Sequence, residues 1–352
     1  MDFLERLREN KRYVDELIER FFPREVDDSY LEWLLGRPAY GYDTATIQRT
    51  VFEPMWDLLD RGGKRWRPWL YLTMARCLGV ELDGYSRLCV VIELIHNGSL
   101  IADDVEDSAL VRRGGPAIHV KYGEDVAVNL SSAMYFMPVR LLLEMGLDDR
   151  TFRRLVTAYF EDMIRIHFGQ ATDIGWHRGL RDPGEVTVEE YLQMCANKTG
   201  VLPRMAAKFA AILAGLPDGD VERLGRFAET VGVAFQIRDD VLNLTGGEKL
   251  GKERGEDITE GKVSLPVIYA MRRAPPEGRE RLRQILRMHT RDRRLIEEAI
   301  SIIEESGAIE EAQETAKRMV REAWSEAEGV LPDNEHKEML RQLVVFLVER
   351  EM

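Results

Sequence analysis

The chain has 352 residues, of which 45% are hydrophobic, and this is enough apolar material for a large buried core. Charged residues reach 32%, and the formal net charge is −13. Such an acidic surface argues against a nucleic-acid partner, because phosphate backbones are bound by basic faces. The N-terminus MDFLERLREN is charged from its start and the apolar runs are short, so we expect no signal peptide and no transmembrane segment. The three cysteines lack paired or metal-ligand spacing, so we expect buried thiols in a cytoplasmic protein.

Helical periodicity runs through nearly the whole sequence, and no segment alternates in the manner of a strand. From the apolar spacing and the Gly/Pro turns between segments we predict helices at 3–22, 46–60, 67–78, 84–107, 125–145, 150–174, 187–213, 219–244, 262–272, 278–288, 293–305, 308–329 and 334–350. The segment 84–107 is apolar on most sides, as expected of a helix at the centre of a bundle. No linker or composition shift divides the chain. We therefore predict a single all-α domain over residues 1–352, in which residues 1–60 form an N-terminal helical extension of undefined role.

Two acidic triplets end two of the apolar helices: Asp103-Asp104-Val-Glu-Asp107 and Asp239-Asp240-Val-Leu-Asn243. Positions i and i+4 share one face of a helix, so each triplet aims two or three oxygen-bearing groups into one small volume. A single copy of this pattern is most often a solvated helix face. Two copies, each directly after a buried apolar stretch, instead favour a site for hard divalent cations, because unpaired carboxylates are costly there. Mg²⁺ takes oxygen ligands and fills its remaining positions with waters and substrate phosphates, so the triplets predict a diphosphate site.

Clusters of cations beside glycines supply the further positive charge that a diphosphate needs. Four clusters qualify: Gly62-Gly63-Lys64-Arg65-Trp66-Arg67-Pro68, Arg112-Arg113-Gly114, Lys198-Thr199-Gly200, and the pair Lys252 and Lys262 around a Gly-rich segment. Arg offers bidentate contacts to phosphate and Lys offers a point charge. A lone basic pair is usually ordinary surface, but four such clusters fit phosphate binding better. His96, nearly two turns before Asp103 on the same helix, is more often a core residue in such a place, yet here we expect it to contact phosphate.

These motifs resemble those of the trans-isoprenyl diphosphate synthases in the polyprenyl synthetase family. The matching segments occur in the family's order from about residue 60 onwards: GGKRWRP at 62–68, ELIHNGSLIADDVEDSALVRRGGPAIH at 93–119, GQATD at 169–173, KTG at 198–200, FQIRDDVLN at 235–243 and GKERGEDITEGKVSLP at 251–266. The resemblance implies the isoprenoid synthase fold, a bundle of about ten to thirteen helices around a central cavity. It also implies a homodimeric enzyme that condenses isopentenyl diphosphate with an allylic diphosphate (dimethylallyl, geranyl or farnesyl).

The resemblance further implies roles for individual residues. The metal ligands would hold about three Mg²⁺ ions, with Mn²⁺ as a substitute, on the allylic diphosphate; they are Asp103, Asp104, Asp107, Asp239, Asp240 and Asn243. The same diphosphate would be bound by Arg112, Lys198, Lys252 and Lys262. Isopentenyl diphosphate would be bound in a second, metal-free site by Lys64, Arg67, His96 and Arg113. Thr199 and Gln236 would line the reacting region, and Asp173 would support the metal cluster.

The implied reaction is ionisation of the allylic C–O bond, attack of the isopentenyl double bond on the carbocation, and loss of a proton. Metal ions and cations would stabilise the departing diphosphate, and the second site would hold the nucleophile in place. Asn243 departs from the family pattern, in which the second triplet usually ends in Asp. Asn keeps an oxygen but loses a charge, so we expect a weaker or water-mediated metal contact there.

Small residues beneath the first triplet predict a long product. Gly98 and Ser99 precede Asp103 by five and four positions, where farnesyl-making relatives carry bulky aromatic residues. One helical turn rises about 5.4 Å, close to one isoprene unit. We therefore expect an all-trans product of twenty carbons (geranylgeranyl diphosphate) or more, with Tyr135 and Phe136 as candidates for the floor of the cavity. In the alternative interpretation, Gly98 only lets another helix approach.

Two other functions share part of the pattern. A class I terpene cyclase has the first triplet and the helical fold, but its second motif needs a Ser/Thr and then a Glu at four-residue steps, and the positions after Asp239 are Asn243 and Gly247. A non-catalytic regulatory subunit of a heteromeric prenyl synthase would be expected to have lost acids from the triplets, and only Asn243 departs. The sequence therefore favours a prenyltransferase, with these two as alternatives.

Overall fold

The computed structural model describes residues 3–246 and 254–349. The chain divides into two compact units, Met1–Val156 and Thr157–Met352, and each unit is described by itself. The predicted all-α class is confirmed, since the strands in the described parts of the chain are limited to one two-stranded hairpin. The prediction of a single domain stays a prediction.

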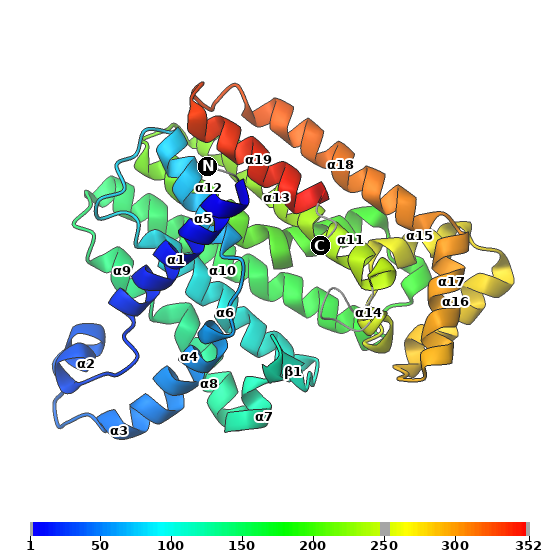
Figure 1. The fold of residues 1–352 in the computed structure, drawn as a ribbon, viewed down its shortest axis with the longest axis horizontal. Coiled ribbons are helices and arrows are strands. Elements are labelled where there is room, and N and C mark those ends of the chain that lie inside the picture. Colours follow the sequence, from blue (N-terminus) through cyan, green and yellow to red (C-terminus); the bar gives the residue numbers. More distant parts are fainter. Residues whose placement is uncertain (1–2, 247–253, 350–352) are drawn as a thin grey trace. The chain divides into compact units, whose positions relative to one another are not determined.

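The first unit consists of helices, one hairpin and the beginning of a long helix that continues into the second unit (Figure 1). In chain order its elements are α1 (Phe3–Phe21), α2 (Asp28–Leu35), α3 (Thr44–Ile47), the π-helix η1 (Gln48–Phe52), α4 (Glu53–Asp60), α5 (Trp66–Cys77), α6 (Leu88–Glu106), β1 (Val111–Arg112), β2 (Gly115–Pro116), α7 (Ile118–Tyr122), α8 (Glu124–Phe136), α9 (Val139–Leu143) and α10 (Asp149–His177).

Helix α6 lies at the centre of the first unit's core. It packs against α8 and α5 and also contacts α1, α7 and α9. Every residue from position 88 to position 95 is buried, so this half of the helix has no solvent-facing side. This burial explains why the sequence shows no amphipathic stripe there, as expected of a central helix.

The second unit is also helical (Figure 1). After α10 its elements are the 3₁₀ helix η2 (Pro183–Glu185), α11 (Val188–Cys195), the π-helix η3 (Ala196–Gly200), α12 (Val201–Leu213), α13 (Asp218–Thr245), α14 (Glu256–Thr259), α15 (Leu265–Arg273), α16 (Pro276–Met288), α17 (Arg293–Glu305), α18 (Ala308–Ala327) and α19 (Glu335–Glu349).

Helix α13 is the central element of the second unit. It packs along α12 and α18 and contacts η3 and α19 (Figure 1). Its residues Val231–Phe235 are all buried. The neighbouring α11 begins at a capping box, in which the Thr187 hydroxyl accepts the Glu190 N–H and the Glu190 carboxylate accepts the Thr187 N–H. That box fixes the start of the helix that leads into η3.

The observed helices follow the predicted ones closely, apart from small shifts at their ends. Sequence reasoning missed α2, α7, α14 and the hairpin, because each is too short to show a periodic pattern. The predicted helix 125–145 is two helices, since Pro138 lies in the turn between α8 and α9 and lacks an N–H for the helical ladder.

One segment of the described chain, Glu124–Leu143, has the length and composition of a membrane-spanning helix, with a mean hydropathy of 1.4. Within the first unit 44% of it is buried, and its α8 part packs on α6. A core helix passes the same test, so this segment is weak evidence for a membrane span.

Candidate active site

The first acidic triplet lies at the C-terminal end of α6. In this half of the helix, one side carries His96, Ser99, Leu100 and Asp103, which are all partly exposed. These positions recur every three to four residues, and Asp107, the half-buried C-cap, continues the series. One open stripe of the helix therefore leads from His96 to the acids.

Asp104 is not on this stripe, because its side chain is buried and bound by Arg112. Its exposed fraction is 1%, and its Oδ1 accepts the Arg112 Nε–H at 2.7 Å. Burial raises the pKa of the Asp104 carboxyl, and the Arg112 guanidinium opposes that rise. Arg112 also lies 3.8 Å from an oxygen of Asp103. These contacts favour Asp104 as the residue that holds Arg112 beside Asp103.

The hairpin β1–β2 carries Arg112 and Arg113 close to the triplet. Arg112 pairs with Gly115 across the hairpin, and the two turn residues, Arg113 and Gly114, have positive φ values of 50° and 74°. Two positive φ angles fit the tight hairpin turns whose twist matches the strands. The turn thereby separates two adjacent arginines, so that Arg112 contacts Asp104 and Arg113 contacts Asn97.

Arg61, directly after α4, binds the main chain of this hairpin. Its Nη1 donates to the carbonyl oxygens of Arg112 (3.1 Å) and Pro116 (2.7 Å). Asp57 in turn accepts from Arg61 Nη2 at 2.6 Å and from its Nε at 2.9 Å. A side chain at Gly115 would displace the Arg61 guanidinium, because a Cβ there would lie 2.8 Å from Arg61 Cζ.

His96 lies among the cations predicted to bind isopentenyl diphosphate. Its Nε2 is 3.3 Å from Arg67 Nη1, and since a guanidinium can only donate, Nε2 accepts and Nδ1 carries the proton. Burial, together with Arg67, Arg113 and other nearby arginines, holds the pKa of His96 well below its ordinary value. His96 is therefore a neutral hydrogen-bonding group near pH 7, and the positive charge of this cluster comes from the arginines.

Gly63 brings the GGKRWRP segment close to Arg113. A Cβ on Gly63 would lie 3.1 Å from both Arg113 Nη2 and Arg65 Nη1, and its φ of 145° is one that side chains rarely adopt. Burial lowers the pKa of Arg113 to about 10, so it stays cationic near pH 7. Lys64, the next residue, is exposed.

Gly98 contacts α8 closely. A Cβ on Gly98 would lie 3.0 Å from Met134 Cβ, 3.1 Å from the Ser131 carbonyl oxygen and 3.2 Å from a ring carbon of Tyr135. This contact favours the interpretation in which Gly98 lets a second helix approach. Ser99, by contrast, is half-buried on the open stripe one turn before Asp103.

The two candidates for the cavity floor differ in burial. Tyr135 has an exposed fraction of 9%, whereas that of Phe136 is 63%. Burial raises the pKa of Tyr135 to about 12. Since Tyr135 lies beside Gly98 on the packed side of α8, it is the stronger candidate of the two.

The second acidic triplet lies near the end of α13. Asp239 is half-buried, whereas Asp240 is buried and accepts the Tyr191 O–H at 2.6 Å, the Gln236 Nε2–H at 2.9 Å and the Leu265 N–H at 3.4 Å. Burial raises the pKa of Asp240 to about 6, and these hydrogen bonds oppose that rise. Its partners favour a positioning role over direct metal coordination.

Asn243 is tied to the segment that begins α14. Its Oδ1 accepts the Asp257 N–H at 3.2 Å, and its carbonyl oxygen accepts the Gly255 N–H at 2.9 Å. The predicted metal-binding oxygen of Asn243 is thus engaged with the backbone. The amide supplies the capping contact that a helix N-terminus needs, which favours a structural role for this departure from the acidic pattern.

A π-helix places Lys198 and Thr199, because η3 separates α11 from α12. Glycines let the neighbouring helices approach its backbone. A Cβ on Gly169 of α10 would lie 2.5 Å from the Lys198 nitrogen, and one on Gly232 of α13 would lie 2.6 Å from Gly200 Cα. No side chain fits at either contact without displacing the main chain.

The predicted residues of the second unit are linked by hydrogen bonds. Lys198 Nζ donates to Asp173 Oδ2 at 2.5 Å. The Thr199 hydroxyl donates to Gln236 Oε1 at 2.9 Å, and Gln236 donates to Asp240. Lys262 forms an ion pair with Glu260. Lys252 lies outside the described residues.

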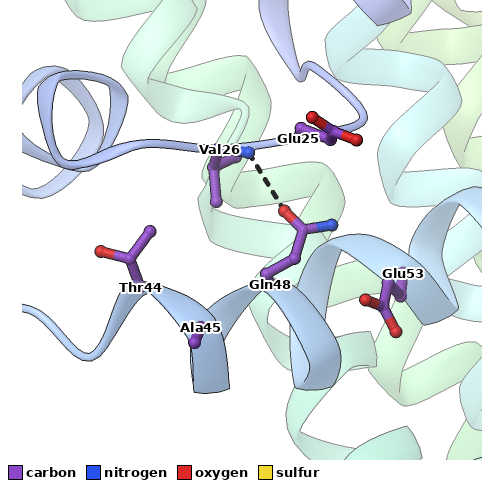
Figure 2. Close-up of a pocket in the computed structure, with 6 residues that line it drawn as sticks. All are labelled: Glu25, Val26, Thr44, Ala45, Gln48 and Glu53. Atoms are coloured by element: carbon purple, nitrogen blue, oxygen red, sulfur yellow. Dashed lines mark hydrogen bonds between the residues drawn. The ribbon is translucent and has the colours of Figure 1, made fainter.

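A groove on the first unit contains none of the predicted site residues. It has a volume of about 480 Å³ and is lined by Glu25, Val26, Thr44, Ala45, Gln48 and Glu53 (Figure 2). Gln48 Oε1 accepts the Val26 N–H there at 3.0 Å. Two glutamates and no cation line this groove, so it does not suit a diphosphate.

The outer acids of the triplets fit a hard divalent cation, because carboxylate oxygens on one helical face are the ligands that Mg²⁺ accepts. Within the described part of the chain, no three His, Cys, Asp or Glu side chains form a ready metal cage. A cation bound here would need further oxygens from water and phosphate, in keeping with the way Mg²⁺ is usually held.

The family model described as polyprenyl synthetase matches residues 48–303. The chain belongs to the polyprenyl synthetase family. A short chain isoprenyl diphosphate synthase from Methanothermobacter thermautotrophicus is 36% identical over 303 residues, which cover 86% of this chain and 91% of that relative. A geranylfarnesyl diphosphate synthase from Aeropyrum pernix is 35% identical over 303 residues, which cover 83% of this chain and 92% of that relative.

The fold of this polyprenyl synthetase matches solved structures over its whole length. The crystal structure of geranylgeranyl pyrophosphate synthetase from Pyrococcus horikoshii aligns with a TM-score of 0.84 and 28% identity over 99% of both chains. The predicted isoprenoid synthase fold and the predicted enzyme class, a trans-prenyltransferase, are confirmed. Enzymes of the family use divalent metal ions.

Several residues that organise the polyprenyl synthetase site were missed in the sequence. Arg61 directly precedes the glycines of GGKRWRP, and its charge was the available signal. Glu93 and Asn97 are polar residues inside the apolar run of α6, which is itself a signal of a buried network. Tyr191 carries no signal, because its partner Asp240 is far away in sequence.

Proposed function

We propose that this chain condenses isopentenyl diphosphate head to tail with an allylic diphosphate, and that its all-trans product has twenty carbons or more. The observation that supports the proposal is that two different sets of polar side chains lie on or beside α6. Asp103 and Asp107 form a carboxylate set that would need metal ions, whereas Arg67 and Arg113, together with the neutral His96, form a cationic set that needs none. A reaction between two diphosphates, only one of which ionises, requires two such sets.

In this proposal Asp103, Asp107 and Asp239 would hold about three Mg²⁺ ions on the allylic diphosphate. Bound Mg²⁺ would supply the positive charge that stabilises the diphosphate as it leaves. Asp104 and Asp240, which were expected to be ligands as well, keep Arg112 and Gln236 in place. This division of roles is supported by the burial and the hydrogen bonds of the two middle acids.

The cations act directly on the substrates. Arg112, Lys198 and Lys262 bind oxygens of the allylic diphosphate and stabilise the charge that develops as its C–O bond breaks. Lys64, Arg67, His96 and Arg113 hold isopentenyl diphosphate, whose double bond attacks the carbocation. The released diphosphate takes the proton that the new product loses. Thr199 and Gln236, joined by a hydrogen bond, line the reacting region.

The expected chain length rests on Ser99 and Tyr135. Ser99 leaves the stripe beneath Asp103 without a bulky side chain, and Tyr135 limits growth further along. We propose geranylgeranyl diphosphate as the main product and geranylfarnesyl diphosphate as the next. The names of the Aeropyrum and Pyrococcus relatives support this range.

We also propose a cytoplasmic homodimer. The cysteines Cys77, Cys89 and Cys195 are buried free thiols, which fits a reducing compartment. On α10 the exposed side chains Phe160, Ile164 and Phe168 recur at four-residue spacing, with exposed fractions of 46%, 61% and 70%. An apolar stripe of this kind is typical of a subunit interface.

An incubation of the purified chain with Mg²⁺, isopentenyl diphosphate and each allylic diphosphate tests the proposal. We expect products of twenty carbons or more, and we expect EDTA to abolish them. Asp103→Asn and Asp239→Asn should each lower kcat by about a hundredfold or more, because each removes charge that acts on the leaving group. Asp218→Asn, at the opposite end of α13, is the matched control and should retain activity.

Other outcomes would identify the alternatives. A terpene cyclase would release a hydrocarbon or alcohol from the allylic diphosphate without isopentenyl diphosphate. A regulatory subunit would form no product on its own. Farnesyl diphosphate as the final product would contradict the expected chain length and leave the enzyme class intact.

A further inference from the structure

We propose that Asn97 is a positioning residue that orients Arg113 toward isopentenyl diphosphate, as the last member of a buried chain of polar contacts that begins on α1. The proposal rests on the function proposed above, in which Arg113 binds this substrate. It assigns a role to Glu93, Asn97, Arg65 and Asp15, and it gives the N-terminal helix a part in substrate binding.

Both ends of the Asn97 amide have defined partners. Asn97 has an exposed fraction of 0%, and its Nδ2 donates to the carbonyl oxygen and to Oε1 of Glu93, both at 2.8 Å. Its Oδ1 accepts the Arg113 Nη1–H at 3.0 Å. Because the Glu93 oxygens can only accept and the guanidinium can only donate, the amide is held in one orientation.

The chain of polar contacts continues from Glu93 to α1. Glu93 Oε1 also accepts from Arg65 Nη1 at 2.7 Å, and both side chains are almost fully buried, with exposed fractions of 3% and 1%. Arg65 Nε donates to Asp15 Oδ1 on α1 at 2.8 Å, and its Nη2 donates to the Leu59 carbonyl oxygen. A buried charge is stable only when it is paired and hydrogen-bonded, so each link holds the next in place.

A neutral amide, that of Asn97, suits the last position in this chain of polar contacts. A carboxylate in direct contact with Arg113 would neutralise the guanidinium and compete with the substrate phosphate for it. Asn97 instead gives Arg113 a fixed direction through a neutral acceptor, and the negative charge of Glu93 is balanced by Arg65. Arg113 thus keeps its charge for an anion, with an orientation set in advance, which lowers the entropy cost of binding.

The position of Arg113 makes such support necessary. Arg113 is the first turn residue of a hairpin of two-residue strands, and its φ of 50° is unfavourable for a side-chain-bearing residue. Its guanidinium also lies close to that of Arg65, since both would be 3.1 Å from a Cβ on Gly63. The two positively charged guanidinium groups repel each other unless hydrogen-bond acceptors offset their charge, and Glu93 and Asn97 supply those acceptors.

Steady-state kinetics and binding of isopentenyl diphosphate in EDTA test the role of Asn97. For Asn97→Leu we expect the KM for isopentenyl diphosphate, and its Kd in EDTA, to rise about tenfold, as for loss of a hydrogen bond to a charged group. The KM for the allylic diphosphate should stay within about twofold, since its site is separate. Asn10→Leu is the matched control, because Asn10 is a buried amide of the same unit outside this chain of contacts.

A double-mutant cycle shows whether Asn97 acts through Arg113. If it does, Asn97→Leu added to Arg113→Ala should raise the KM for isopentenyl diphosphate little beyond Arg113→Ala alone. Full additivity would overturn the proposal, and so would equal rises in the KM values of both substrates. If thermal unfolding shows that Asn97→Leu does not fold, Asn97→Thr, which loses the donor to Glu93, should shift the same KM in the same direction; an unchanged KM there would also overturn it.

Failure of the proposed function gives a different result. If the unaltered chain bound no isopentenyl diphosphate in EDTA and formed no condensation product, the function itself would be wrong. If the unaltered chain bound and condensed the substrate, and the Asn97 variants did so equally well, only the role of Asn97 would be wrong.

Discussion

Tyr135 and Phe136 are adjacent aromatic residues on α8 with opposite surroundings, and this contrast bears on product length. Tyr135 is buried beside Gly98, whereas Phe136 is largely exposed. The sequence offered both as the floor of the cavity, because neighbouring positions on a helix cannot be separated until the packing partner of that helix is known. We therefore expect Tyr135, the buried one of the two, to limit product length.

We therefore predict that Tyr135→Ala lengthens the main product by one isoprene unit or more, because it removes a buried ring at the floor. Tyr135→Phe keeps the volume of the ring and should leave the product distribution unchanged. Phe136→Ala is the matched control and should also leave it unchanged. Radiolabelled products separated by chain length provide the measurement. Longer products from Phe136→Ala, with none from Tyr135→Ala, would reverse the assignment.

The acidic residues show how far residue-level prediction reaches. The pattern placed the two triplets where two apolar helices end, and in the structure they lie near the ends of α6 and α13. It treated the members of each triplet as equivalent, because spacing alone does not reveal burial. Asp104 and Asp240 differ from their neighbours through partners that lie far away in sequence or on another element, such as Tyr191 and Leu265.

At the scale of elements, the contact between α13 and η3 depends on glycine. Gly232 of α13 touches Gly200 of η3, and a Cβ on Gly232 would lie 2.6 Å from Gly200 Cα. Because that neighbour is main chain, it cannot move aside by changing a rotamer. The same bulge carries Lys198 and Thr199, so the contact joins packing to the proposed chemistry.

We predict that Gly232→Ala lowers the free energy of unfolding by about 1–3 kcal/mol through overpacking and reduces kcat by displacing Lys198. Gly219→Ala is the matched control in the first turn of the same helix, where a Cβ would meet nothing within 4 Å. That change should be neutral or stabilising by up to about 1 kcal/mol, since alanine has the higher helix propensity. Denaturant unfolding of both variants checks this; equal stabilities would mean that the backbone contact is not tight.

Long helices could be predicted from the sequence, whereas short or irregular elements could not. The long helices α10 and α13 follow from their apolar spacing and α6 from its long apolar run. The π-helix η3 could not be predicted, because it has the composition of an ordinary helix and differs only in the approach of its neighbours. The hairpin that carries Arg112 and Arg113 contains two-residue strands and depends on Arg61.

At the scale of the whole molecule, the motifs predicted the family, and the family model confirms it. The family model begins at residue 48 and therefore leaves α1, α2 and α3 outside it. The sequence assigned no role to this extension. In the structure α1 contacts α5 and α6, and its Asp15 binds Arg65, which connects the extension to the GGKRWRP segment.

We predict that the chain is a dimer in solution and that Ile164→Asp weakens the dimer at least tenfold, because it places a charge at the centre of the apolar stripe on α10. Light scattering after size-exclusion chromatography over a concentration series measures the effect. Ser325→Asp, at an exposed position of α18, is the control and should not change the mass. A monomeric unaltered chain at micromolar concentration would contradict the proposed dimer.

Arg61 binds the hairpin through the main-chain oxygens of Arg112 and Pro116, and these two hydrogen bonds need no particular side chain at either position. Exposed residues such as Leu110 and Val111 can therefore be exchanged without releasing the two arginines beside them. Asp57 is less tolerant of change, since it binds Arg61, Lys121 and Tyr122 at once. We therefore expect the exposed residues beside Arg112 and Arg113 to tolerate substitution, and Arg61 and Asp57 to tolerate little.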